Sequence, residues 1–377
     1  MILEKFRQIV DNSHEYALKW KSATGGKVCG CISANVPEEL LYAAGVLPVR
    51  VIANPHVPPN LASHHIQANR CACCQGCLEL GLQGQYDYLD GLVHVQSCLA
   101  QSLTFSSWVM HRPPAFTYRM FRPFRQTEVA RKVYSDFLGD FKSSLEKWLG
   151  KPISEKSLVD ALAVYRENRL LMKQVYELRK KNPPVISGSD AQRMVLASMV
   201  MDKKEHNDMT RQLLEELRKK KASGNGRVRT MIMGSGMSPL DFTELIEKTG
   251  GDVIVEDHCL GLRYFWGDDV AGENPMDALV KYYYDNKPQC AYQDWTGEGT
   301  MKRLLSTARA FNVEAVIWLA QIFCGTHQWD IVDGIALFEK EGIPLLKLER
   351  GRDIPRERFQ TEVKAFFEQV KAKQPRR

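Results

Sequence analysis

From residue 228 onward, short apolar runs alternate with longer amphipathic segments. Runs rich in Val, Ile and Leu predict buried strands at 228–233, 252–256, 313–319 and 343–348. Apolar residues at steps of three or four predict helices at 239–248, 301–311, 331–341 and 356–371. This alternation favours a mostly parallel, doubly wound sheet with right-handed crossovers, and it excludes an all-helical or an all-β fold.

The first third of the chain carries a similar pattern. A helix is expected at 3–22, then a glycine-containing loop, a second helix at 37–44 and an extended run at 47–53. Gly91–Gln96 reads as a buried strand that ends just before Cys98. Open α/β sheets bind ligands at the carboxyl ends of their strands, so Cys98 stands at a candidate site.

Between these two regions the sequence is almost wholly helical. The charged stretch from Lys219 to Arg227 lacks apolar anchors, and we place the main domain boundary there. The prediction is an N-terminal helix plus a first α/β domain over 1–125, a helical segment over 126–221 and a second α/β domain over 222–377. The expected fold class is therefore α/β, with two doubly wound, Rossmann-like domains and a helical segment between them.

Composition limits the setting in which the protein works. The 377 residues are 44% apolar, enough for conventional cores. The N-terminus has no secretory pattern, and the apolar run Val313 to Cys324 is far shorter than the roughly 20 residues that cross a bilayer. The net charge of +6 is spread along the chain. We therefore expect a cytoplasmic protein that binds neither membrane nor nucleic acid.

Five of the ten cysteines lie between residues 71 and 98. Cys71, Cys74 and Cys77 form a C-x2-C-x2-C pattern, and thiolates at this density suit an iron–sulfur cluster or zinc. The fourth cysteine of a bacterial ferredoxin is missing, because Gly81 occupies its place. In a reducing compartment such cysteines are better metal ligands, catalytic thiols or small buried residues than disulfides.

Cys324 also follows a predicted strand, as Cys98 does in the first region. The two could face one another across a cleft between the domains. His327 and Asp330, on the following helix, could supply a proton donor and its orienting carboxylate, or could pack locally. The remaining cysteines fit small buried residues better than metal ligands: Cys29, Cys31, Cys259 and Cys290.

Several segments together resemble the family of 2-hydroxyacyl-CoA dehydratase subunits and ATP-dependent benzoyl-CoA reductase catalytic subunits. These segments follow one another in the family's order over nearly the whole chain. They are Val36–Arg50, Cys71–Gly81 with Tyr86–Val93 and Cys98, Gly234–Leu240, Asp257–Tyr264, Phe323–Asp330 and Gly342–Glu349.

The resemblance implies a [4Fe-4S] cluster held by three cysteines from separate places. Mapped onto this chain, the ligands are Cys71, Cys98 and Cys324. Cys74 and Cys77 remain alternatives for the first ligand, because this chain has four cysteines where relatives often have one or two. His327 and Ser33 are candidates for proton delivery.

Within the family, the Cys77 and Cys324 segments look most like the smaller catalytic subunit of a benzoyl-CoA reductase. The resemblance then implies low-potential, one-electron reduction of an aryl-CoA thioester. Its implied partners are a homologous larger catalytic subunit and ATP-hydrolysing iron–sulfur activator subunits, with ferredoxin as the indirect electron donor.

Three alternatives remain open at this stage. One is a 2-hydroxyacyl-CoA dehydratase subunit, and another is a double-cluster reductase of small molecules from the same family. The third, from a different class, is a zinc-stabilised binding module built around Cys71 to Cys77, although that pattern lacks a nearby fourth ligand.

Overall fold

The computed structural model describes most of the chain. The residues outside the description are 1, 55, 221–226, 235–238, 269–273, 291–292, 295, 352–354, 374–377 and the side chain of Pro239. Most of the predicted boundary stretch and the centre of the glycine-containing turn before residue 240 therefore lie outside the described residues.

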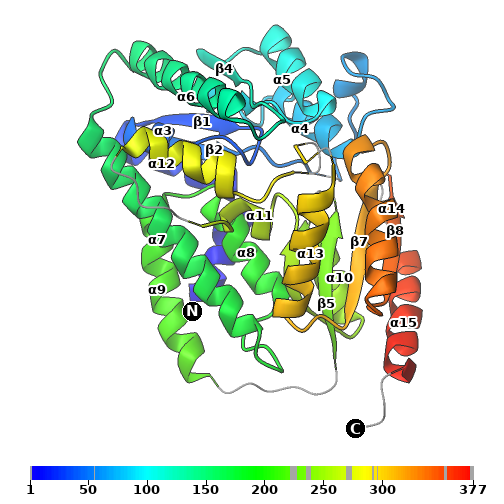
Figure 1. Cartoon of the computed structure of the whole chain (residues 1–377). Coiled ribbons are helices and arrows are strands. Elements are labelled where there is room, and N and C mark those ends of the chain that lie inside the picture. The colour runs from blue at the N-terminus through cyan, green and yellow to red at the C-terminus, as the bar shows by residue number, and fades with distance from the viewer. Residues whose placement is uncertain are drawn as a thin grey trace.

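Two four-stranded sheets organise the molecule, and every pairing in them is parallel (Figure 1). The strands of the first sheet are β1 (Lys27–Cys31), β2 (Val46–Arg50), β3 (Gly91–Val95) and β4 (Phe116–Met120). Those of the second are β5 (Val228–Gly234), β6 (Gly251–Asp257), β7 (Ala315–Gln321) and β8 (Leu345–Arg350). The orders β2-β1-β3-β4 and β6-β5-β7-β8 are the same arrangement, in which the chain reverses direction across the sheet beside its first strand.

Helices cover both faces of the first sheet. Alternate strand residues pack on the two sides, as the two-residue period of a strand requires. Val28 and Leu92 face α4 (Ala72–Leu82) and α5 (Leu99–His111). Cys29 and Val93 face α3 (Glu38–Ala43) and α6 (Glu128–Leu149). Cys29 and Cys31 are thus small buried residues of β1, as the sequence predicted.

The second sheet is covered in the same way. Ile232 and Ile317 pack against α10 (Pro239–Lys248) and α15 (Arg356–Lys373). Met233 and Trp318 face the opposite side, toward α13 (Glu298–Ala310) and α14 (Gly325–Lys340). The predicted α/β class with two doubly wound parallel sheets is therefore confirmed.

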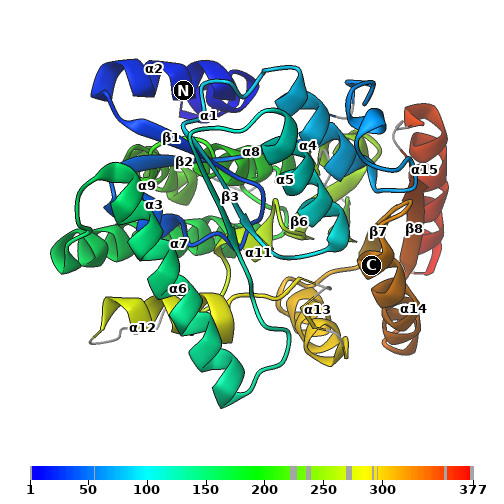
Figure 2. The same ribbon diagram turned by 90° about the horizontal axis from the view of Figure 1, so that it is seen from above.

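The helical segment joins the two halves through α7 (Glu155–Arg179), α8 (Gly188–Ser198) and α9 (Lys203–Lys219). Figures 1 and 2 show α7 and α9 on the opposite side of the molecule from β8 and α15. In α7, Arg169 pairs with Glu39 at 2.7 Å, and Arg179 pairs with the fully buried Glu256 of β6. Helix α7 is thereby anchored to both halves of the chain.

The predicted elements differ from the structure mainly in the first third of the chain. The loop expected after the first helix contains β1, and β4 was not anticipated. The single helix expected at 3–22 is two helices, α1 (Ile2–Asp11) and α2 (Ser13–Thr24), which break at Asn12.

Among the described helices, none combines the length and apolar character needed to cross a bilayer.

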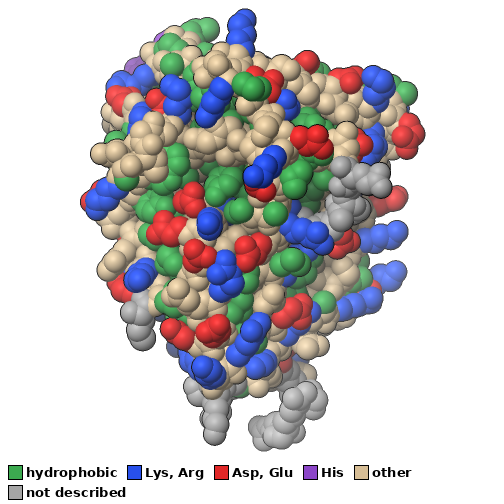
Figure 3. Space-filling view, turned by 90° about the vertical axis from the view of Figure 1, so that its left-hand side faces the viewer, with side chains coloured by type: hydrophobic (Ala, Val, Ile, Leu, Met, Phe, Trp, Pro, Cys, Tyr) green, Lys and Arg blue, Asp and Glu red, His purple; other side chains and the backbone are tan. Residues whose placement is uncertain are grey.

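On the face shown in Figure 3, Lys and Arg side chains are interspersed with Asp and Glu. That face therefore presents no broad basic surface of the kind that binds a phosphate backbone.

Candidate functional site

One cavity, with about 1110 Å³ of empty space including its open mouth, gathers chemistry from both halves of the chain. It lies where strands of both sheets end: Ser33 follows β1, Arg50 ends β2, Cys98 follows β3 and Cys324 follows β7. Eight of the ten cysteines line it: Cys71, Cys73, Cys74, Cys77, Cys98, Cys259, Cys290 and Cys324. The structure thus brings together every cysteine that the sequence singled out as a candidate ligand.

Cys71, Cys98 and Cys324 share one structural position. Each is the residue that immediately precedes a helix: α4, α5 and α14, respectively. The first N–H groups of a helix have no partner inside the helix, and they carry a partial positive charge. Three such helix starts at one cavity favour a bound group of negative charge, because each directs N–H groups at the site.

The cysteines of α4 divide into two sets. Cys71 and Cys74 form a cluster with Ala100, and Cys98 and Cys324 pack against that cluster. The Cys71 and Cys74 sulfurs are 3.3 Å apart, and the Cys74 thiol also hydrogen-bonds Cys98. Cys71 and Cys74, both candidates for the first ligand, therefore lie beside the other two predicted ligands, Cys98 and Cys324.

Cys73 and Cys77 form the second set. They hydrogen-bond each other, and the Cys77 sulfur lies 4.0 Å from the carbonyl oxygen of Val51 in the strand-end segment after β2. Cys77 therefore has neighbours different from those of Cys71 and Cys74.

The predicted ligands Cys98 and Cys324 differ in acidity. The hydrogen bond from Cys74, supported by N–H groups at the start of α5, lowers the pKa of Cys98 to about 6. Burial, together with the nearby Cys71, raises the pKa of Cys324 to about 12. Cys98 is therefore the more acidic of these two thiols, and thiolate is the form that binds iron.

Arg50 supplies an unbalanced positive charge. Its side chain is 6% exposed, and its Nε and Nη1 atoms have no hydrogen-bond partner among the described residues. The described lining of the cavity contains no Asp or Glu. A buried guanidinium with two partnerless nitrogen atoms is costly, so the site is suited to an anionic group. Thiolates around an iron–sulfur cluster meet that need, and the residues present fit such a cluster.

Ser33 and His327 also line the cavity. The Ser33 hydroxyl accepts a hydrogen bond from the Asn35 N–H at 3.2 Å. Burial and the nearby Arg263 lower the pKa of His327 to about 3, and its buried Nδ1 has no partner among the described residues. The ring is therefore neutral at pH 7, and so low a pKa makes it a weak proton acceptor. Asp330, the expected orienting carboxylate, makes no described hydrogen bond to His327.

Residues other than the predicted ligands and proton donors also line the cavity. Arg263 reaches the cavity while its guanidinium is held by Asp257, whose other oxygen pairs with Arg303. Cys259 and Cys290, expected as buried packing residues, are partly exposed in the cavity wall. The sequence feature that could have indicated such lining residues is their position at the end of a predicted strand. Arg50 and the segment after β6 both have this position.

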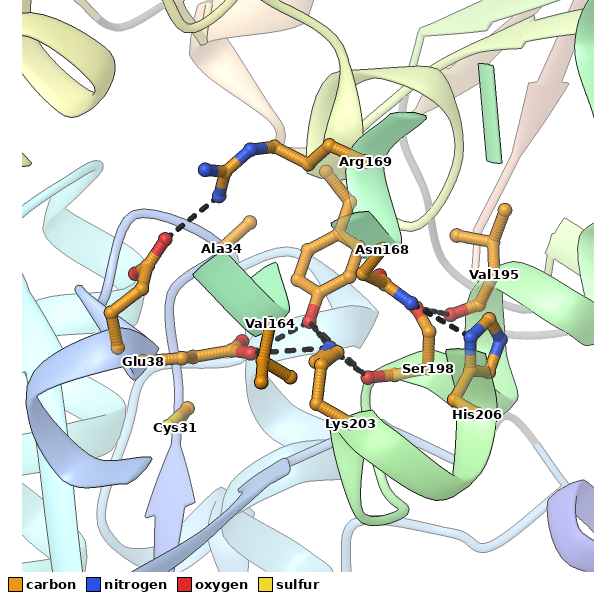
Figure 4. Close-up of polar contacts among 12 residues, drawn as sticks. Cys31, Ala34, Glu38, Val164, Asn168, Arg169, Val195, Ser198, Lys203 and His206 are labelled. Atoms are coloured by element: carbon orange, nitrogen blue, oxygen red, sulfur yellow. Dashed lines mark hydrogen bonds and ion pairs between the residues drawn. The ribbon is translucent and has the colours of Figure 1, made fainter. Parts of the chain in front are cut away.

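Figure 4 shows a network of polar contacts among buried residues, several of them charged. Lys203 lies between Glu38 and the Ser198 carbonyl, and Asn168 contacts His206. The Tyr264 hydroxyl donates to Glu38 at 2.7 Å. Lys287 connects this network to the cavity, since its ammonium donates at 2.6 Å to the carbonyl of Ala34, a lining residue.

Among the described residues, no three His, Cys, Asp or Glu side chains converge at the spacing of one metal ion. A zinc-binding module requires such a convergence. A four-iron cluster does not, because each thiolate binds a different iron. The two kinds of site therefore differ in the arrangement of thiols that each needs.

Known proteins share the sequence over most of its length. The chain is 25% identical over 369 residues to the (R)-phenyllactyl-CoA dehydratase beta subunit of Clostridium sporogenes, covering 96% of this chain and 97% of that one. It is 27% identical to a benzoyl-CoA reductase subunit of Thauera aromatica, covering 82% and 81%. It is 22% identical to the lactoyl-CoA dehydratase beta subunit of Anaerotignum propionicum, covering 98% of each.

These relatives are subunits of enzymes named for CoA thioesters, which agrees with the resemblance found in the sequence motifs. A family model described as "2-hydroxyglutaryl-CoA dehydratase, D-component" matches residues 33–370, which include every residue of the cavity wall named above. The chain therefore belongs to the 2-hydroxyglutaryl-CoA dehydratase D-component family.

Proposed function

We propose that this chain is the iron–sulfur subunit of an enzyme that reduces an aryl-CoA thioester, of the benzoyl-CoA reductase type. The observation that carries the proposal is the cavity in which Cys71, Cys98 and Cys324 each begin a helix. A [4Fe-4S] cluster held there would supply single electrons at low potential.

The chain's own residues have distinct roles in this proposal. Cys71, Cys98 and Cys324 bind iron as thiolates, and the starts of α4, α5 and α14 offset their negative charge. Arg50 adds a full positive charge from β2. Cys71 and Cys74 are buried beside Ala100, which limits the access of water to their thiols. His327 could hold a proton at Nδ1 or Nε2 beside the site.

The substrate class rests on the relatives. Benzoyl-CoA and (R)-phenyllactyl-CoA, named for two of them, both combine an aromatic ring with a CoA thioester. Ring reduction is our first candidate, because the Cys77 and Cys324 motifs resemble the reductase branch. Dehydration of a 2-hydroxyacyl-CoA is the second, because the phenyllactyl-CoA relative matches nearly the whole chain.

Partners follow from the same comparison, since the relatives are named as subunits. The proposed partners are a homologous larger catalytic subunit and an ATP-hydrolysing iron–sulfur activator that is reduced by ferredoxin. We propose that the complex works in the cytoplasm.

The test is co-expression with the larger subunit and anaerobic purification. We expect about four irons per copy of this chain, as one four-iron cluster requires. With the activator, ATP and a reductant, the complex should reduce benzoyl-CoA and hydrolyse ATP as it does so.

Conversion of (R)-phenyllactyl-CoA with loss of water, and no reduction of benzoyl-CoA, would instead support the dehydratase candidate. A colourless, zinc-containing and well-folded complex would refute both. If clusters form but CoA thioesters neither react nor perturb their spectrum, the small-molecule reductase alternative is favoured.

A further inference from the structure

We infer that Cys74 is a fourth cysteine ligand, so that Cys71, Cys74, Cys98 and Cys324 together enclose the cluster. This inference rests on the proposed function and goes beyond the three-cysteine site that the family resemblance implies. It assigns a specific role to one of the additional cysteines of this chain.

The position of Cys74 provides the first argument. It lies in the first turn of α4, three residues after Cys71, so the two side chains share one face of the helix. Its sulfur is 3.3 Å from that of Cys71, and its thiol also hydrogen-bonds Cys98. Cys74 thus lies between two of the predicted ligands, on the side of α4 that faces Cys324.

The surroundings of Cys74 provide the second argument. The side chain is 3% exposed, and the buried residue that completes its cluster is Ala100, at the start of α5. The Thr104 hydroxyl of α5 donates to the Cys74 carbonyl at 3.0 Å, which holds the first turn of α4 against α5. A residue needed only for packing would have apolar neighbours, whereas the cluster around Cys74 consists of Ala100 and other cysteines.

The other cysteines in the cavity are poorer candidates. Cys73 and Cys77 bond each other, and Cys77 is directed at Val51. Cys259 lies near Cys73. Cys77 and Cys259 are outside the cluster of Cys71, Cys74 and Ala100, and Cys73 packs against that cluster while bonding to Cys77.

The fourth ligand has a functional consequence. Each cysteine binds as a thiolate and releases its proton. Four thiolates leave no iron with a position open to a substrate oxygen. The thioester would then bind in the partner subunit, and this chain would serve in electron supply.

The experiment uses the anaerobic complex and ferricyanide as a one-electron oxidant. A cluster with three cysteines, once oxidised from [4Fe-4S]2+ to the 3+ level, can release one Fe2+ and leave [3Fe-4S]+, which has a distinct EPR signal. We expect little of this conversion in wild type and in Cys77→Ala. In Cys74→Ala the signal of the three-iron cluster should be several-fold stronger. Cyanide should shift the EPR spectrum of the reduced cluster only in Cys74→Ala.

The wild-type complex decides the matter even if a variant folds poorly. Wild type that contains four irons and readily gives the three-iron signal would overturn the fourth ligand but leave the proposed function intact. Equal resistance in wild type and Cys74→Ala would also overturn it. A wild-type complex without iron would refute the proposed function itself.

Discussion

Cys98 and Cys324 occupy equivalent positions in the two halves of the chain. Each follows the third strand of its sheet, β3 or β7, and each immediately precedes a helix. Because the two sheets have the same strand order, the site is built from one structural position used twice. Cys71, at the start of α4, is the proposed ligand without a counterpart in the second half.

Cys98→Ser and Cys324→Ser should therefore have equal effects on iron. We expect either variant to lose most of its iron, because each removes one proposed ligand and the equivalent cysteine in the other half of the chain cannot take its place. Serine is among the preferred residues before a helix, so α5 and α14 should remain folded. Iron content and circular dichroism of the anaerobic complex test this. Full iron content in one variant would show that the two halves do not contribute equally.

Gly81 shows why the ferredoxin pattern stops after its third cysteine. A Cβ at this position would lie 2.5 Å from the ring of Trp108 on α5, so no cysteine fits there. We expect Gly81→Ala to lower the free energy of unfolding by about 1–3 kcal/mol through overpacking between α4 and α5.

Gly139→Ala is the matched control, since a Cβ there meets nothing within 4 Å on α6. That variant should gain about 0.5–1 kcal/mol from helix propensity. Denaturant titrations of both variants give the comparison. A Gly81→Ala variant as stable as wild type would contradict the close packing of α4 on α5.

Sequence periodicity was sufficient for the second sheet but not for all of the first. The strand β1 reads Lys-Val-Cys-Gly-Cys, and Gly30 is present because a Cβ would lie 2.6 Å from the Leu89 side chain. A glycine forced by tertiary packing resembles a loop residue in the sequence. The strand β4 follows Pro113 and Pro114 and is buried only at its ends, so its alternation is weak.

The site was predictable to the extent that it depends on strand ends. Cys98 and Cys324 follow recognisable strands, and the structure brings both to one cavity. The position of Cys290 in the cavity wall depends on contacts between segments far apart in the sequence. The spacing of residues along the sequence does not reveal such contacts. For the same reason, the sequence alone does not distinguish Cys71, Cys74 and Cys77 as ligands.

Arg50→Met should change the metal-free and iron-loaded proteins in opposite directions. Without an anion, the variant removes a buried guanidinium that lacks partners, so the metal-free protein should gain stability. With the cluster bound, a compensating charge is lost. If the reduced cluster loses about 1.4 kcal/mol more stabilisation than the oxidised cluster, the one-electron reduction potential falls by about 59 mV. Thermal melts with and without iron, and a redox titration, test both signs; equal shifts in the two melts would argue against an anion at Arg50.

The buried ion pair Arg179–Glu256 should contribute far more to the free energy of unfolding than the exposed ion pairs do. Arg179 also donates at 2.6 Å to the Val253 carbonyl, and Tyr176 donates to Glu256 at 2.6 Å. Arg179→Met leaves Glu256 as an unpaired buried charge, and we expect a loss of about 3–5 kcal/mol.

The exposed pair between Arg211 and Glu167 provides the control, since both side chains are about half exposed. Arg211→Met should cost at most about 1 kcal/mol. Chemical denaturation of both variants gives the values. A small loss for Arg179→Met would mean that α7 does not hold the second sheet in place.

Lys287 predicts a dependence of stability on pH. Burial lowers its pKa from 10.5 to about 7 in the folded chain, against the opposing influence of Glu38 and Glu39. Between these two pH values the unfolded chain binds more protons, so the free energy of unfolding should rise with pH, by at most about 1.4 kcal/mol per pH unit. Below pH 7 both states are protonated, and this contribution is constant.

Lys287→Met removes the titrating group and keeps a long apolar side chain beside the rings of Tyr264, Tyr282 and Tyr283. The difference in unfolding free energy between wild type and variant isolates Lys287 from the cysteines that titrate in the same range. We expect this difference to grow in favour of wild type from pH 7 to 10 in urea titrations of the metal-free protein. A difference that stays constant over this range would mean that Lys287 keeps its ordinary pKa, and that the cavity wall at Ala34 is held by a permanently charged ammonium.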